Sequence, residues 1–196
     1  MGVRAMDDAA CARLWRFIKG NCDLMHIDSL LEVRYERIGE GCFVDNKIGA
    51  VSRKPCTIIV NVDWYETTNE FDIRYILRHE TRHLYQFNQI EKLHQGKPIE
   101  QSPEVILKWE REFNHYISNT PATEKAHFEQ SCEFDAYVYA SFAESVATLK
   151  DDGCQILLPG HKYIMGAVEQ AVTAQLAKTP GPVLRLYRDI FAAQNI

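Results

Sequence analysis

The order of apolar and polar positions along the chain predicts a small sheet followed by helices. Apolar and charged residues alternate over 31–38, with one slip at the end, which is typical of a half-buried strand. The segments 42–44 and 48–51 flank a turn at 45–46 and fit a hairpin, and the β-branched run 57–62 predicts a further strand. Because the connections are short, we expect an antiparallel sheet of three or four strands.

Helical spacing of apolar residues dominates the rest of the chain. Asp7 is placed to cap a first helix that closes at 20–21. After a loop, Asn69 precedes and Gly96 follows a second amphipathic segment, which predicts a helix over 70–94. The remaining helices are expected at about 103–117, 120–147, 161–178 and 183–193. These elements together predict an α+β fold.

The length of 196 residues suits one domain with a sizeable core. We therefore expect a single domain over 1–196, in which the residues from about 157 onward form a helical C-terminal extension. The segment 151–160, which contains Asp, Gly and Pro, is the one weak candidate for a boundary.

Composition excludes several classes of partner. A net charge of −5 gives no electrostatic reason to expect nucleic acid or an anionic membrane as a partner. No apolar run approaches the roughly 20 residues that span a bilayer, and the N-terminal segment lacks an apolar signal core. We therefore expect a cytoplasmic protein whose 6 cysteines are reduced thiols. The sequence leaves the oligomeric state open.

A His-Glu-x-x-His motif lies in the middle of the predicted helix 70–94. His79 and His83 are four residues apart and project from the same face of that helix. This spacing allows two imidazoles to bind one Zn²⁺. Glu80, between them in sequence, can take a proton from water without being a ligand. The motif therefore predicts a zinc site with Glu80 as general base.

A catalytic zinc ion needs a third protein ligand and one open position. The segment 130–140 offers two carboxylates, Glu133 and Asp135, on a predicted helix. They are about 200° apart around a helix, so one ion cannot readily use both. Either residue is therefore a candidate for the third ligand.

The two motifs together resemble the gluzincin group of zinc metallopeptidases. The resemblance rests on His-Glu-Thr-Arg-His at 79–83 and Glu-Phe-Asp-Ala-Tyr-Val-Tyr-Ala at 133–140. It is nearest to the minigluzincins and to the phage-associated peptidases that act on immunity repressors. The resemblance implies a zincin-like fold, with a small sheet, an active-site helix, a glutamate helix and additional C-terminal helices. It also implies that His79, His83 and Glu133 are the zinc ligands and Glu80 the general base.

One departure from the gluzincin pattern concerns the position four residues after the ligand glutamate. Gluzincins usually have an aspartate there, which supports a histidine ligand, whereas this chain has Tyr137. A phenol replaces a carboxylate only weakly in that role. The departure leaves room for Asp135 as the third ligand, as in zinc peptidases that use aspartate, although the Gly-Thr pair that precedes the ligand in that group is missing here.

The function implied by the resemblance is zinc-dependent hydrolysis of a protein or peptide substrate. The oxyanion of the reaction needs a further donor, for which the sequence offers His127, Tyr137, His161 and Tyr163 without ranking them. The alternative is a catalytically inactive protein of the same fold that binds or regulates a partner. An intact Glu80 argues against that alternative, because a structural zinc site has no need of a general base.

Overall fold

The computed structural model describes residues 5–27, 29–150, 155–158, 163–194 and 196, which contain eight α-helices and three β-strands. The predicted α+β class is therefore confirmed. The chain divides into two compact units, one formed by Met1–Asn88 with Gln194–Ile196 and the other by Gln89–Ala193. None of the helices in the described residues combines the length and the apolar character that crossing a bilayer requires.

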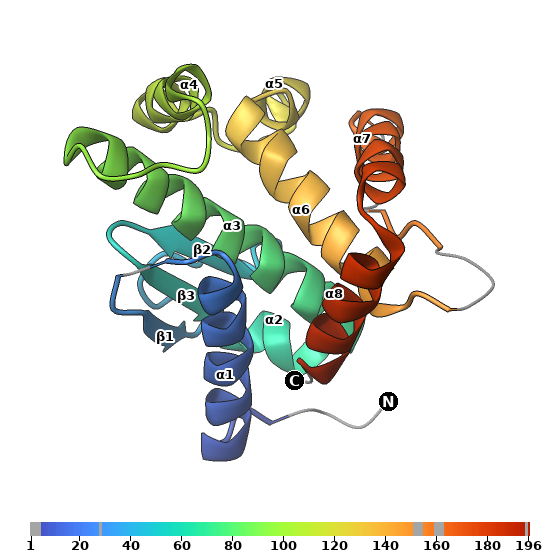
Figure 1. Cartoon of the computed structure of the whole chain (residues 1–196). Coiled ribbons are helices and arrows are strands. Elements are labelled where there is room, and N and C mark those ends of the chain that lie inside the picture. The colour runs from blue at the N-terminus through green and yellow to red at the C-terminus, as the bar shows by residue number, and fades with distance from the viewer. Residues whose placement is uncertain (1–4, 28, 151–154, 159–162, 195) are drawn as a thin grey trace. The chain divides into compact units, whose positions relative to one another are not determined.

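The sheet of the first unit contains β1 (Glu32–Glu36), β2 (Ala50–Arg53) and β3 (Thr57–Asn61), in the order β1-β3-β2 (Figure 1). All five residues of β3 are buried, as expected for a central strand. β2 pairs antiparallel with β3, whereas β1 pairs parallel with it. The prediction of an all-antiparallel sheet is therefore wrong. The connection from β1 to β3 includes β2 and is long enough for the crossover that a parallel pair needs.

The predicted hairpin between 42–44 and 48–51 is also wrong. Residues 42–44 form no strand, and β2 makes its hairpin with β3 through the turn at 54–56. The side chain of Asn61 explains this difference, since its Nδ2 donates to the carbonyl oxygens of Asp45 (3.1 Å) and Ile48 (3.0 Å). These bonds hold the segment before β2 as a loop.

Helix α1 (Asp8–Leu24) begins as the sequence predicts, with Asp7 Oδ1 accepting from the backbone N–H of Ala10 at 2.7 Å. It continues one turn beyond the expected end at 20–21. The added turn buries Asn21 and Cys22, and that burial favours continuation of the helix through Gly20. The hydroxyl of Tyr35 on β1 donates to the carbonyl of Cys11 at 3.0 Å, which ties α1 to the sheet.

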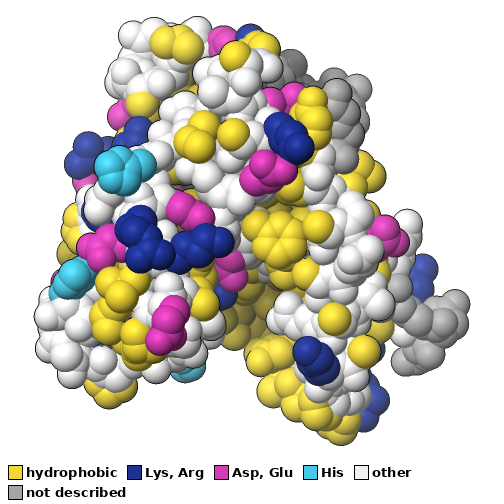
Figure 2. All heavy atoms as spheres, turned by 90° about the horizontal axis from the view of Figure 1, so that it is seen from above, with side chains coloured by type: hydrophobic (Ala, Val, Ile, Leu, Met, Phe, Trp, Pro, Cys, Tyr) yellow, Lys and Arg dark blue, Asp and Glu magenta, His cyan; other side chains and the backbone are white. Residues whose placement is uncertain are grey.

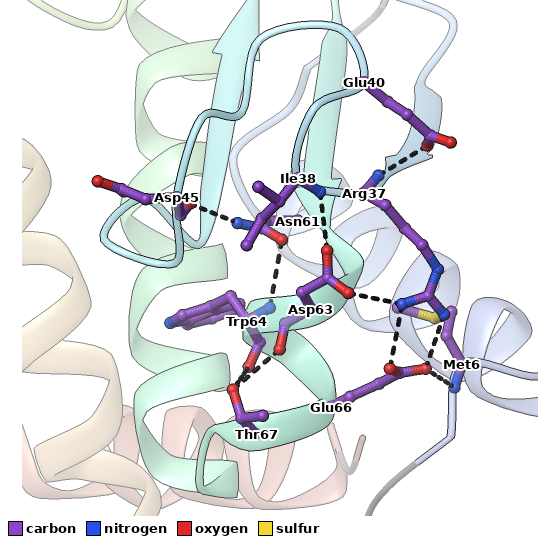
Figure 3. Close-up of polar contacts among 10 residues, drawn as sticks. All are labelled: Met6, Arg37, Ile38, Glu40, Asp45, Asn61, Asp63, Trp64, Glu66 and Thr67. Atoms are coloured by element: carbon purple, nitrogen blue, oxygen red, sulfur yellow. Dashed lines mark hydrogen bonds and ion pairs between the residues drawn. The ribbon is translucent and has the colours of Figure 1, made fainter.

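Helix α2 (Val62–Thr67) occupies a segment that the sequence predicted as a loop. Asn61 Oδ1 caps it by accepting from the N–H of Trp64 at 3.2 Å. Arg37 bridges Asp63 and Glu66 on this helix, and Asp63 also accepts from the N–H of Ile38 at 2.7 Å (Figure 3). We call Arg37, Asp63 and Glu66 the surface carboxylate cluster.

Helix α3 spans Glu70–His94 and matches its prediction at both ends. The side-chain oxygen of Asn69 accepts from the N–H of Asp72 at 3.0 Å, and Gly96 takes a positive φ of 65° after the helix ends. The N-cap residue and the glycine after the helix are both next to the helix in sequence, so the sequence alone predicts where the helix begins and ends.

The second unit is helical. Its complete helices are α4 (Pro103–Asn114), α5 (Glu124–Phe128), α6 (Ser131–Ala147), α7 (Met165–Lys178) and α8 (Gly181–Ala193). α6 is the central element, because α4, α5, α7 and α8 all contact it (Figure 1). The prediction of one helix over 120–147 is wrong, because extended backbone at Gln130 separates α5 from α6.

The other predicted helices of this unit are close to those observed. α4 ends at Asn114 instead of 117, since the N–H of His115 closes the helix on Arg111 and Glu112. The start expected for α7 and most of the candidate boundary at 151–160 lie outside the described residues.

Candidate metal centre

The two histidines of α3 face each other and are buried. They are 4% and 5% exposed, and their Nε2 atoms lie 3.0 Å apart. Their rings meet edge-on at 88°. Two nitrogen ligands of a tetrahedral zinc ion, each about 2.0–2.1 Å from the metal, are separated by about 3.3 Å. The observed separation is therefore close to that of two ligands of one ion.

Gln86 determines which nitrogen of His83 is available. Its Oε1 lies 2.8 Å from His83 Nδ1, and an amide oxygen only accepts, so Nδ1 carries the proton. The Nε2 lone pair of His83 then points at Nε2 of His79. Two imidazole nitrogens in this arrangement need a proton or a cation between them, and Gln86 fixes the tautomer that a metal requires. The sequence analysis did not identify Gln86, although a residue three positions after His83 on a helix is its neighbour on the helix surface.

Glu80 differs from the two histidines in its environment. It is half-buried, and no hydrogen bond or ion pair within the described residues holds its carboxylate. A carboxylate that is next to the histidine pair in sequence, accessible to water and not engaged is suited to accept a proton.

Glu133 lies in the first turn of α6 in the second unit and is 1% exposed. Glu112 of α4 fixes the start of this helix, because its Oε2 accepts from the Ser131 hydroxyl at 2.7 Å and from the Cys132 N–H at 2.9 Å. A carboxylate in this position satisfies donors that a helix start leaves open. Burial raises the pKa of the Cys132 thiol, so this neighbour of Glu133 is a neutral, apolar group.

Two side chains lie against the Glu133 carboxylate, and one of them donates a hydrogen bond to it. The Tyr116 hydroxyl donates to Oε1 at 2.7 Å, and Nε2 of His127 lies 3.5 Å from Oε2. His127 is fixed in turn, since its Nδ1 donates to the carbonyl of Ile117 at 2.9 Å. We call Tyr116, His127 and Glu133 the buried carboxylate cluster. The sequence analysis did not identify Tyr116 as a candidate.

The structure groups His79, His83 and Glu133: one ligand atom of each lies within 4.8 Å of the other two, and all three residues are buried. A buried His-His-Glu group of this kind can hold a metal ion. Asp135, the alternative third ligand, is not part of the group.

The remaining candidates from the sequence are placed as follows. Tyr137 is buried, with its ring 5.6 Å from that of Phe128. Tyr163 is 44% exposed. His127 belongs to the buried carboxylate cluster, and His161 lies outside the described residues.

The charged side chains on the face drawn in Figure 2 give no second candidate among the described residues. On the face drawn in Figure 2, basic and acidic side chains lie next to one another and form no patch of a single sign. The exposed His94 is paired with Glu110, with Nε2 and Oε1 2.8 Å apart.

Comparison of the chain with models of protein families, with curated proteins and with solved structures finds no match. The candidate metal centre therefore rests on its own residues.

Proposed function

We propose that this protein is a zinc-dependent metallopeptidase with a zincin-like fold. His79, His83 and Glu133 hold the ion, and Glu80 is the general base. The observation that carries the proposal is the buried His-His-Glu group beside a glutamate that is half-buried and not engaged. Buried ionisable groups that converge in this way are typical of functional sites.

The donor set of two imidazoles and one carboxylate fits zinc, and three protein ligands leave one position open. Bound Zn²⁺ would supply Lewis acidity, which activates water and polarises a carbonyl group. The chain's own contribution is Glu80, which accepts a proton from the attacking water and then donates it to the leaving amine. Gln86 keeps the Nδ1 proton of His83 in place, so that Nε2 stays available.

The test measures bound metal and peptide cleavage on the full chain. We expect about one zinc ion per chain, lost in His79→Ala and retained in His94→Ala. His94 is the matched control, because it lies on the same helix but is exposed and paired with Glu110. Glu80→Gln should keep the zinc and lower kcat for a cleaved peptide by about 10²–10⁴-fold, the usual contribution of a general base.

The outcomes separate the two functions that the sequence allows. Wild-type protein that binds no metal would refute the metal centre. Wild-type protein that binds zinc but cleaves nothing in a broad peptide library would instead indicate a binding or regulatory protein.

A further inference from the structure

Tyr116 is the solvent-side partner of a carboxylate that is otherwise buried. Its side chain is 44% exposed, whereas Glu133 is 1% exposed, and its hydroxyl donates to Glu133 Oε1 at 2.7 Å. A phenol that donates to an ionised carboxylate makes a strong, short hydrogen bond. One of the two oxygens of Glu133 is thus engaged by a group of the chain.

The position of Tyr116 is fixed by its neighbour in sequence. The N–H of Ile117 donates to Gln130 Oε1 at 2.9 Å, and the Ile117 carbonyl accepts from Gln130 Nε2 at 3.1 Å and from His127 Nδ1 at 2.9 Å. The Tyr116 ring also meets the His127 ring edge-on, with centroids 5.7 Å apart. Backbone and ring are therefore both held, and the hydroxyl is preorganised toward Glu133.

We propose that Tyr116 is a positioning residue that restricts Glu133 to one oxygen toward a bound metal ion. The inference rests on the proposed function, in which Glu133 is a metal ligand. A carboxylate can bind a metal through one oxygen or through both. With Oε1 engaged by the phenol, Glu133 contributes a single donor, and the position that water and substrate need stays open.

The consequence is specific to the hydroxyl group. Without it, the carboxylate can turn both oxygens to the metal and raise the coordination number. The same change removes an outer hydrogen bond that orients the ligand, and loss of such partners typically lowers metal affinity about 10–100-fold.

The experiment compares Tyr116→Phe with Tyr187→Phe on the full chain, using Co²⁺ as the spectroscopic probe and Zn²⁺ for affinity. Tyr187 is the matched control, because it is half-buried in the same unit and packs its ring on Phe142 and Phe191. Visible absorption per bound Co²⁺ is stronger in four-coordinate sites than in sites of higher coordination number. At saturating Co²⁺ this readout is insensitive to a purely structural loss of stability.

We expect Tyr116→Phe to lower the visible absorption per bound Co²⁺ and to lower the Zn²⁺ affinity by at least about tenfold. Tyr187→Phe should change neither. If folded Tyr116→Phe has the wild-type spectrum and affinity, the role of Tyr116 is refuted while the metal centre stands. If wild-type protein binds neither ion, or if Glu133→Ala binds both as wild type does, the failure lies in the proposed function instead.

Discussion

The surface carboxylate cluster and the buried carboxylate cluster place their carboxylates in opposite environments and beside different partners. In the first, Arg37 bridges Asp63 and Glu66, and its side chain is 49% exposed. In the second, Tyr116 donates to Glu133 and His127 lies beside it, and Glu133 is 1% exposed. The surface cluster contains the ion pairs of Arg37 with Asp63 and Glu66, whereas Glu133 contacts a phenol and an imidazole.

The difference in solvent exposure determines how much each carboxylate contributes to stability and whether it needs a bound cation. Water can replace the partners of Asp63 and Glu66, so their bonds fasten a loop to α2 at little net gain. Removing a carboxylate from water costs several kcal/mol unless other charges offset the loss. A buried carboxylate grouped with two buried imidazoles is therefore better explained by a bound cation than by stability alone.

The largest expected effect comes from the buried cluster itself. Glu133→Ala removes a proposed metal ligand and should abolish zinc binding at concentrations that saturate the wild type, because two histidines alone do not complete a catalytic site. Isothermal titration with Zn²⁺ measures this. Asp135→Asn is the matched variant on the same helix and should bind zinc as the wild type does; the reverse result would make Asp135 the third ligand.

A smaller effect is expected from the residue that holds the start of α6. Glu112→Ala leaves the Ser131 hydroxyl and the Cys132 N–H without their acceptor, which should lower the free energy of unfolding by about 1–2 kcal/mol. Urea unfolding measures the loss. Lys108→Met is the control, since its ammonium lies 3.9 Å from Glu112 and its side chain is 55% exposed. An equal loss in both variants would show that the charge pair, and not the cap, matters.

The smallest effect is expected from the surface cluster. Arg37 lowers the pKa of Glu66 through direct hydrogen bonds. The pKa of Asp63 is lowered mainly by the hydrogen bond from the Ile38 N–H and further by Arg37. A carboxylate with a lowered pKa stabilises the fold above its unfolded pKa, and this contribution is lost as pH falls through the folded pKa. Arg37→Met should therefore shift the urea midpoint less than Glu112→Ala does.

The pH dependence and salt dependence of Arg37→Met sharpen the comparison. The difference from wild type should be constant near neutral pH, shrink as Asp63 and Glu66 become protonated in acid, and diminish in high salt. A difference that persists in acid would mean that Arg37 acts through packing and not through its charge.

The sequence determined the elements whose signals are local. α3 begins after Asn69 and ends before Gly96 as predicted, and the spacing of His79 and His83 on one helix face follows from helical geometry alone. The α+β class likewise follows from periodicity, which each segment carries in its own residues.

Only the tertiary structure decided features that depend on residues far apart in the chain. The parallel pairing of β1 with β3 depends on the direction in which β1 runs beside β3, which the connection between the two strands sets. The hydrogen bond from Tyr116 to Glu133 joins two segments, and no short-range sequence pattern predicts that they meet. Periodicity reports which face of an element is buried, but it carries no information about what that face meets, so the partners of a buried polar group are settled by packing.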